Sequence, residues 1–246
     1  MSSSSQTRRR RAGSFVPSLP TTHEMPPSQV RPSQRTSLLA ANYDPIDALH
    51  QYLSVSRVAV ASGVPPFPNT VNMPIVCNGH LPTHALALYE TSSDRPSQCY
   101  ILPIDSRLYS RGFYTDILSQ ASAGSIPPSR SSDGTITLPL VPYPVPHLPS
   151  AALLLLFGMG LETQINTMAW RLLPPHVIEE FPNAAAMSQM MVRLGEEEFF
   201  SYLAYNQGIW KNVLALGPQD KQLAEMVKTV WNVTADAHRK RQRSQR

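Results

Sequence analysis

The apolar residues of the C-terminal third recur every three or four positions, which is the spacing of one face of an α-helix. One stripe runs from Met187 to Leu216 and stops at Gly217-Pro218, a pair of residue types that ends helices. A second stripe follows, made of Leu223, Met226, Val227, Val230 and Trp231. The pattern therefore predicts a helical C-terminal part in which the chain reverses at the glycine-proline pair.

The first half of the chain carries shorter apolar runs between turn residues, which indicates strands. Residues 84–89 and 99–104 flank a polar link and predict a hairpin with a long loop. Residues 135–141 alternate polar and β-branched side chains, as a strand does. Residues 73–76 are a short apolar piece within a proline-rich loop and predict an edge strand.

Helix starts are marked in this half by residues that cap helices. The three candidate starts are Asp44-Pro45, Asp105-Ser106 and Ser150. We expect the second helix to run on to Leu118, with Gly112 as an internal weak point. The third start precedes the apolar segment 151–157, which predicts a buried helix.

Charge and composition divide the chain into three parts. Residues 1–41 are rich in Ser, Pro and Arg, without an apolar period, so we expect them to be disordered. They hold six arginines and one acid, and residues 238–246 hold five basic residues and no acid. Of 21 basic and 17 acidic residues, 10 and 16 remain in residues 42–237, a balance of −6. We predict one folded interaction domain over 42–237 between two disordered basic tails, 1–41 and 238–246.

The position of the charge bears on the partners. A nucleic-acid-binding domain carries a basic face on its folded body, so sequence-specific binding by this acidic body is not expected. The longest apolar run, 151–157, is too short for the roughly 20 residues of a membrane span. The N-terminus lacks the apolar region of a signal peptide. We expect a soluble intracellular protein whose Cys77 and Cys99 are reduced.

Candidate chemistry is sparse in this sequence. Cys77, His80 and His84 have zinc-ligand side chains, but C-x2-H-x3-H is not a standard zinc spacing, and Pro82 disfavours a helix that would align the histidines. A zinc-containing enzyme using these three residues stays open as an alternative. No Gly-x-Ser-x-Gly turn and no phosphate-binding glycine loop occurs. We therefore expect no catalytic residue, cofactor or resident metal.

Large apolar side chains near the C-terminus are candidate interface residues. Trp210 and Trp231 stand on either side of the Gly217-Pro218 break, and tryptophan is enriched at interfaces. Met190 and Met191 carry flexible side chains that suit an adaptable surface. Packing in the core, with the two indole rings sealing the last two helices together, is the alternative for all four residues.

The order of hairpin, aromatic helix, strand and leucine-rich helix is similar to the BTB/POZ fold. The matching pieces are Ile136-Thr137-Leu138-Pro139-Leu140 and Leu153-Leu154-Leu155-Leu156-Phe157. The stretches VPYPVPHLPSAALLLLF and GIWKNVLALG together resemble the clampless-type proteins of mushroom-forming and related fungi. This resemblance implies a regulator of clamp-cell formation and of dikaryotic sexual development.

From these patterns we expect an α+β protein with a small BTB/POZ-like core and C-terminal helices. We expect it to act without catalysis, through contacts with other proteins such as transcriptional regulators or a second copy of itself. Short basic clusters at both ends predict import into the nucleus. The residues of these clusters are Arg8, Arg9, Arg10, Arg11, Arg239, Lys240, Arg241 and Arg243. A factor that associates with nucleic acid through the tails is a further alternative.

Overall fold

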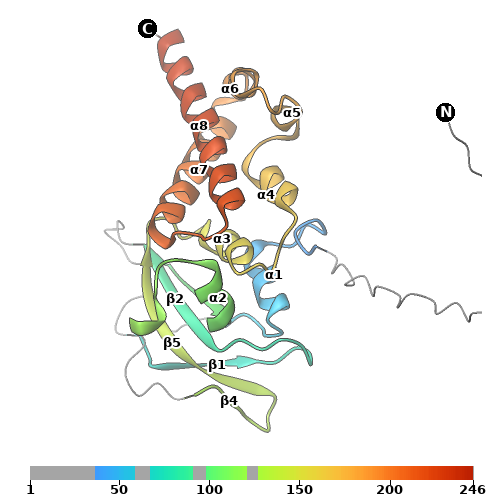
Figure 1. Cartoon of the computed structure of the whole chain (residues 1–246), viewed down its shortest axis with the longest axis vertical. Coiled ribbons are helices and arrows are strands. Elements are labelled where there is room, and N and C mark those ends of the chain that lie inside the picture. Colours follow the sequence, from blue (N-terminus) through green and yellow to red (C-terminus); the bar gives the residue numbers. More distant parts are fainter. Residues whose placement is uncertain (1–36, 59–66, 91–97, 121–126, 246) are drawn as a thin grey trace, which may run out of the picture. The chain divides into compact units, whose positions relative to one another are not determined.

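The structure is a computed structural model that describes residues 37–58, 67–90, 98–120 and 127–245. All of these residues belong to one compact unit, residues 36–246. Figure 1 shows the sheet at one end of this unit and the C-terminal helices at the other. Residues 1–36, for which disorder is predicted, lie outside the described residues, and so does the cluster Arg8 to Arg11.

Helices and strands alternate irregularly along the described chain, which confirms the α+β class. The strands are β1 (Thr70–Pro74), β2 (His84–Glu90), β3 (Cys99–Ile104), β4 (Ser129–Arg130) and β5 (Thr135–Val145). The helices are α1 (Pro45–Tyr52), α2 (Ser106–Gly112), the 3-10 turn η1 (Leu118–Gln120), α3 (Ala151–Gly158), α4 (Ile165–Leu172), α5 (Pro175–Ile178), α6 (Ala184–Val192), α7 (Glu196–Leu216) and α8 (Lys221–Ser244).

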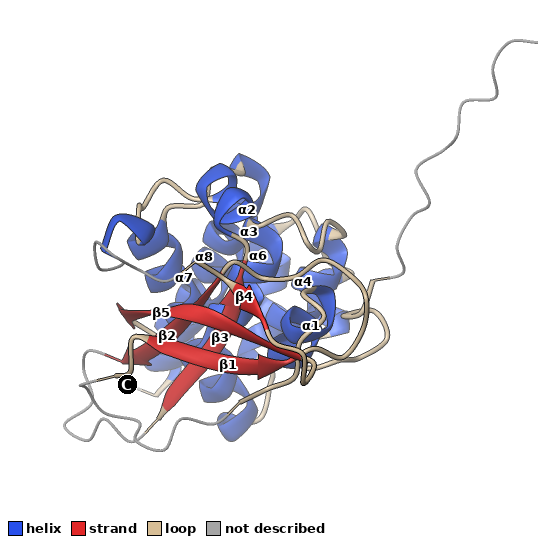
Figure 2. Ribbon diagram, turned by 90° about the horizontal axis from the view of Figure 1, so that it is seen from below, coloured by secondary structure: helices blue, strands red, loops and turns tan. Residues whose placement is uncertain are grey.

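The sheet has the order β1-β5-β2-β3, and β4 adds a short antiparallel pairing to β5. The predicted hairpin is confirmed, because β2 and β3 pair antiparallel with Leu86 opposite Leu102. β2 also pairs with β5, but in parallel, with Ala85 opposite Leu140. An edge strand is present near the predicted residues 73–76, but β1 begins at Thr70 and ends at Pro74, so only Met73 and Pro74 of the predicted piece belong to it. β3 forms the opposite edge of the described sheet. Figure 2 shows the helices behind this sheet.

Two apolar clusters pack on the two faces of the sheet. Successive residues of β2 alternate between them, because neighbouring side chains of a strand point to opposite faces. Leu86 and Leu88 belong to the larger cluster, which includes the fully buried helix α3. Ala85 and Ala87 belong to the smaller one, formed with β1 and β5. The helices therefore cover one face of the sheet.

The predicted reversal at Gly217-Pro218 is confirmed. Gly217 adopts a left-handed conformation with φ 61°, which suits glycine because it has no Cβ. Asp220 then caps α8 by accepting hydrogen bonds from the backbone N–H groups of Gln222 and Leu223. Helices α6, α7 and α8 pack together as a result (Figure 1).

The expected helix from Asp105 to Leu118 is wrong in its second half. Asp105 caps it as expected, but α2 ends at Gly112 and Phe113 is extended. A Cβ at Gly112 would overlap the backbone carbonyl of Gly158, so the glycine is needed for close contact between α2 and α3. Gly112 therefore serves tertiary packing at the end of the helix.

Ser150 does not cap α3 with its side chain, contrary to expectation. Its hydroxyl instead lies 2.8 Å from Nδ1 of His147 and accepts a hydrogen bond from Nδ2 of Asn212 on α7. The packed part also begins earlier than residue 42. Ser37 is buried and donates to the Glu162 carboxylate, and Leu39 lies in the larger cluster.

The predicted disorder of the C-terminal tail is wrong for residues 238–244, because they continue α8. The guanidinium of Arg241 lies 4.5 Å from the ring centroid of Phe199 on α7. It also donates to the backbone carbonyl of Leu194 at 3.1 Å. These contacts hold the basic segment against the neighbouring helices, so it stays helical.

Candidate functional site

Two hollows meet beside β3, the last strand of the described sheet, and together we call them the β3 groove. The first, of about 370 Å³, is lined by Asp44, Pro45, Ile46, Tyr100, Pro149, Arg171 and Tyr205. The second, of about 270 Å³, is lined by Ile46, His50, Arg57, Val58, Cys99, Tyr100, Ile101 and Leu102. Ile46 of α1 and Tyr100 of β3 line both, so the hollows adjoin at these two side chains.

Arg171 supplies the positive charge of the first hollow. Its guanidinium donates to the backbone carbonyl of Tyr43 at 2.7 Å and lies 3.5 Å from that of Leu39. Among the described residues it forms no ion pair. A guanidinium has five donors in a planar fork that fits a carboxylate. Arg171 can therefore accept an anionic partner in the groove.

Other polar groups of the first hollow have defined states. Burial raises the pKa of Tyr205 to about 12, so its hydroxyl is protonated at neutral pH and can donate. The carboxylate of Asp44 accepts from the N–H of Ile46 at 2.9 Å and from Arg57 at 2.7 Å. Arg57 also pairs with Asp47. The negative charge of Asp44 is thus already paired with Arg57. The positive charge of Arg171 is not paired with a carboxylate of the described residues.

His50 is the least satisfied polar group of the second hollow. Only 3% of the residue is exposed, and Nδ1 lies 2.8 Å from the carbonyl of Ile46, so Nδ1 donates. Nε2 has no hydrogen-bond partner of acceptable geometry among the described residues. Burial lowers the pKa of His50, opposed by the carbonyls of Ile46 and Ile101. The ring is therefore neutral at pH 7, with Nε2 as an unused acceptor.

Helices α1, α4 and α7 and strand β3 bring these groups to one groove. Asp44 and Pro45 fix the start of α1, and the helical spacing of Ile46 and His50 places both on one side of it. Arg171 lies in the last turn of α4, where it reaches the chain before α1. Tyr205 comes from the middle of α7. Four separate elements thus contribute to the groove.

The candidate zinc ligands are not brought together. Cys77 Sγ lies 3.2 Å from the Ser54 hydroxyl, and Nε2 of His80 lies 3.1 Å from the Asp105 carboxylate. His84 contacts the Thr83 hydroxyl through Nδ1. Within residues 37–58, 67–90, 98–120 and 127–245 no group of three His, Cys, Asp or Glu side chains could hold a metal ion. The geometry offers no support for the zinc-enzyme alternative.

A half-buried histidine, His147, pairs with a buried serine, Ser150, in the connection between β5 and α3. His147 Nδ1 is 2.8 Å from the Ser150 hydroxyl, which is the type of contact found between a catalytic base and a nucleophile. Ser150 is completely buried, however, and also accepts from Asn212. The ring of His147 occupies the space that a Cβ at Gly208 would need. The pair therefore joins the β5–α3 connection to α7.

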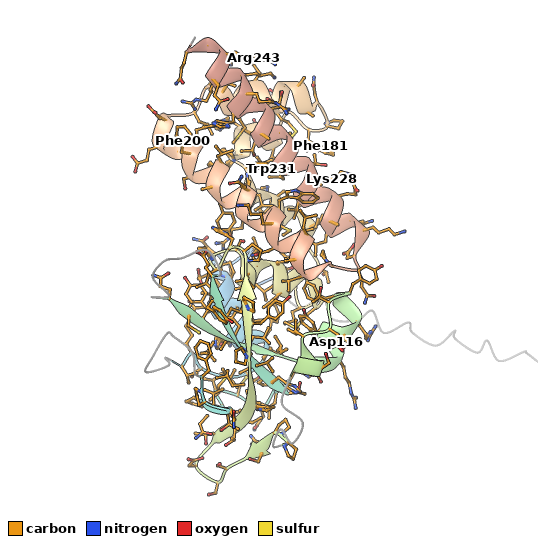
Figure 3. All side chains as sticks on the ribbon, turned by 90° about the vertical axis from the view of Figure 1, so that its left-hand side faces the viewer. Asp116, Phe181, Phe200, Lys228, Trp231 and Arg243 are labelled. Atoms are coloured by element: carbon orange, nitrogen blue, oxygen red, sulfur yellow. The ribbon has the colours of Figure 1, made fainter. Side chains whose placement is uncertain are left out.

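The candidate interface residues divide between surface and core. Met191 is fully buried in the larger cluster, and Met190 is partly buried against it. Trp210 is also partly buried against this cluster. Trp231 is half-buried on α8, where Figure 3 shows it near Lys228. Met191 is thus a core residue, whereas the other three side chains keep some exposed surface.

The C-terminal basic cluster is partly held by the folded body. Lys240 lies 2.9 Å from the Asp236 carboxylate and 3.2 Å from the Ser188 hydroxyl. Arg239 lies 3.5 Å from the same carboxylate. Arg243 is exposed at the far end of α8 (Figure 3). Arg239 and Arg243 are thus the exposed members of this cluster, whereas Lys240 and Arg241 are partly buried.

Sequence reasoning missed the residues of the β3 groove. Arg171, His50 and Tyr205 come from three helices and belong to no motif with a known spacing. The only local signal was the Asp44-Pro45 helix start, which fixes one wall of the groove. The unused acceptor of His50 depends on which other elements surround it, and that is a property of the fold.

Comparison of the chain with protein-family models, with curated proteins and with solved structures finds no match. In the described part of the chain, no helix combines the length and the apolar character that crossing a membrane requires.

Proposed function

We propose that this protein is a non-catalytic nuclear regulator that acts by binding other proteins, and that the β3 groove is one of its binding sites. The observation that supports the proposal is the groove itself, in which the guanidinium of Arg171 lines one hollow and is paired with no carboxylate of the described residues. Concave surfaces with a few placed polar groups are common binding sites.

Part of the proposal rests on family resemblance. The hairpin β2–β3, helix α2, strand β5 and helix α3 follow one another in the order expected of a BTB/POZ-like core. The GIWKNVLALG stretch resembles the clampless-type fungal proteins. We therefore extend the proposal to clamp-cell formation and dikaryotic development. Deletion of the gene in a clamp-forming fungus that carries it should abolish clamp cells; normal clamps would contradict this part.

Nuclear import through the basic clusters is the second part of the proposal. A fluorescent fusion that lacks both Arg8–Arg11 and Arg239–Arg243 should stay in the cytoplasm, while the unaltered fusion enters the nucleus. A nuclear signal unchanged by both deletions would contradict import through these clusters. Because α8 includes residues 239–243, substitution of the four basic residues by Gln is the matched alternative that keeps the helix.

The binding function is tested on the full chain. A tagged chain recovered from nuclei should carry a reproducible set of proteins, and Arg171→Gln should reduce part of that set tenfold or more. Arg193→Gln is the control, because Arg193 is exposed at the end of α6, away from the groove residues. Failure to recover any reproducible partner, or turnover of a substrate by the purified chain, would contradict the proposed function.

A further inference from the structure

We propose that the first hollow of the β3 groove binds the carboxylate of an aspartate or glutamate side chain on a partner protein, between the guanidinium of Arg171 and the hydroxyl of Tyr205. This inference rests on the proposed function and adds the chemical group that the partner presents. The first hollow is accessible to such a group, because Asp44 and Pro149 of its lining are exposed and the other lining residues are only partly buried.

Arg171 keeps donors free for a carboxylate. The two backbone carbonyls that its guanidinium contacts, those of Tyr43 and Leu39, both lie near one nitrogen, Nη2. The N–H groups of Nε and Nη1 form no hydrogen bond within the described part of the chain. A carboxylate would give them charge-assisted hydrogen bonds, which are roughly twice as strong as neutral ones. The ligand can therefore bind Arg171 without displacing the carbonyls that hold it in place.

The hydroxyl of Tyr205 is a second donor in the same hollow. It forms no hydrogen bond to any described residue. Burial raises the pKa of Tyr205 to about 12, and the charges of Arg171 and Asp44 also act on it. The hydroxyl is therefore protonated at pH 7, lies near both charges and can donate to the second oxygen of a bound carboxylate. An edge-on contact with the His147 ring, 5.7 Å between the ring centroids, holds the Tyr205 ring.

Asp44 is the acidic residue of the lining, and its carboxylate leaves one oxygen unused. The hydrogen bonds that it accepts from the N–H of Ile46 and from Arg57 both use Oδ1. The ion pair with Arg57 weakens the repulsion between Asp44 and an incoming anion. Oδ2 can accept from the backbone N–H of the bound residue. An acidic residue of a protein thus offers a carboxylate to Arg171 and a donor to Asp44, whereas a simple inorganic anion offers no such donor.

The form of the hollow favours a side chain of a larger partner over a free small molecule. Its volume of about 370 Å³ is near the lower end of the roughly 300–1,000 Å³ of small-molecule pockets, which bury most of the ligand surface. Here the exposed Asp44 and Pro149 leave one side open. A partner surface over that side would exclude water from the pair with Arg171 and strengthen it. Pro45 and Ile46 provide apolar walls for the methylene groups of an acidic side chain.

The test uses a phage-displayed library of random twelve-residue peptides selected against the full chain. We expect enrichment of peptides with Asp or Glu at a fixed position, and replacement of that acid by its amide should weaken binding about tenfold or more. Arg171→Gln should weaken binding of the acidic peptide to a similar extent, and this variant should no longer distinguish the acid from the amide. A purely structural role of Arg171 would instead lower the affinity for both peptides and preserve the preference for the acid.

Tyr205→Phe is the variant that tests the hollow without loss of a contact within the described chain. Its thermal midpoint should equal that of the unaltered chain, while its affinity for the acidic peptide should fall about threefold to tenfold. Tyr202→Phe is the matched control, because Tyr202 lies one turn earlier in α7 and is not among the lining residues. Unchanged affinity of the acidic peptide for both Arg171→Gln and Tyr205→Phe would overturn the proposal.

Other occupants of the hollow give other results. If amidation of the peptide C-terminus abolishes binding and replacement of the internal acid does not, the hollow takes a chain end, and the assignment to a side chain is wrong. A dimer of the full chain that Arg171→Gln dissociates would also overturn the proposal, because the occupant would then be a second copy.

The failure of this inference can be separated from the failure of the proposed function. If the library gives no acid-dependent ligand but nuclear partners are recovered and are insensitive to Arg171→Gln, the inference is wrong and the binding function stands elsewhere on the chain. If no partner is recovered from nuclei, the proposed function itself is wrong. Thermal unfolding of each variant checks that loss of binding does not come from loss of folding.

Discussion

Asn212 of α7 pairs with the backbone of His147 as a neighbouring strand would. Its Oδ1 accepts the His147 N–H at 3.0 Å and its Nδ2 donates to the His147 carbonyl at 2.6 Å. Asn212→Ala would remove the partner of both part-buried backbone groups of His147. We expect a loss of about 2–4 kcal/mol in the free energy of unfolding, since each unsatisfied buried group costs about 1–3 kcal/mol.

Chemical denaturation measures this loss, and Asn232→Ala is the matched control. Asn232 is exposed on α8, so its substitution should change stability by no more than about 0.5 kcal/mol. Equal stability of the two variants would show that the Asn212 contact does not hold α7 to the β5–α3 connection.

The crossing of α2 and α3 predicts a cost for added methyl groups. A Cβ at Gly112 would overlap the Gly158 carbonyl, and a Cβ at Gly158 would overlap the Phe113 ring. We expect Gly112→Ala and Gly158→Ala each to destabilise by about 1–3 kcal/mol, as overpacking does. The larger loss should belong to Gly112→Ala, because a backbone atom cannot move aside as a ring can.

Gly195→Ala serves as the comparison in thermal unfolding. No atom lies within 4 Å of a Cβ added at Gly195, which precedes α7. Its substitution should cost no more than about 1 kcal/mol, from a weaker helix start. Similar losses in all three variants would contradict the steric explanation.

The two cysteines should differ in reactivity. Burial raises the pKa of Cys99 to about 11, so very little thiolate is present at pH 7.5. Cys77 is exposed. Iodoacetamide should therefore modify Cys77 well before Cys99, as mass spectrometry of digested protein would measure. Faster modification of Cys99 would mean that the second hollow of the β3 groove is more open than described.

Stability should fall on mild acidification. Burial lowers the pKa of His50, His84 and His147 below the ordinary value of 6.5. Below pH 6.5 the unfolded chain binds protons at these rings more readily than the folded chain does. The free energy of unfolding should therefore be flat above pH 7 and decrease between pH 6.5 and 5.

Urea denaturation at pH 7.5, 6.5 and 5.5 measures this dependence. Lys240 lowers the pKa of the Asp236 carboxylate below its ordinary value of 3.8. Carboxylates of this kind therefore change the free energy of unfolding only at more acid pH. The His50→Gln variant should show a shallower decrease than the unaltered chain. A stability that rises on acidification to pH 5.5 would contradict the assignment.

Two arginines of the same tail should behave differently. Arg241→Ala removes the contact with the Phe199 ring and the bond to the Leu194 carbonyl, which together are worth about 1–2 kcal/mol. Arg243 is exposed, so Arg243→Ala should change stability by less than about 0.5 kcal/mol. Thermal unfolding of the two variants under the same conditions makes the comparison, and equal midpoints would contradict the packing of Arg241.

Elements with local signals could be predicted from the sequence. The cap at Asp44, the polar link between the hairpin strands and the Gly217-Pro218 break all act within a few residues of the element they define. The end of α2 could not, because the role of Gly112 depends on Gly158, which comes 46 positions later. The hydrogen bond to the Ser150 hydroxyl could not be predicted either, because its donor, Asn212, is 62 positions away.

The β3 groove was beyond prediction for the same reason. In the sequence, Arg171 is one polar residue of an amphipathic helix. Its role in the groove follows only from the fold, which places α4 beside the chain that precedes α1. His50 fits the helical pattern of α1, and its unused Nε2 follows only from the surroundings that the fold gives it. Composition did predict the acidic body and the basic ends, but which basic side chains are held by that body is again a matter of packing.

The parallel pairing of β2 with β5 also governs the order in which the chain can assemble. Ala85 faces Leu140, 55 positions later, and loop closure over such a span is slow compared with closing the β2–β3 hairpin. During synthesis the hairpin emerges first, with its β2 side still open. The ribosome must release residue 145 before the sheet can close, and Asn212 later still before the helical layer can attach. Premature termination between these points would leave an unpaired central strand, the kind of segment that chaperones protect.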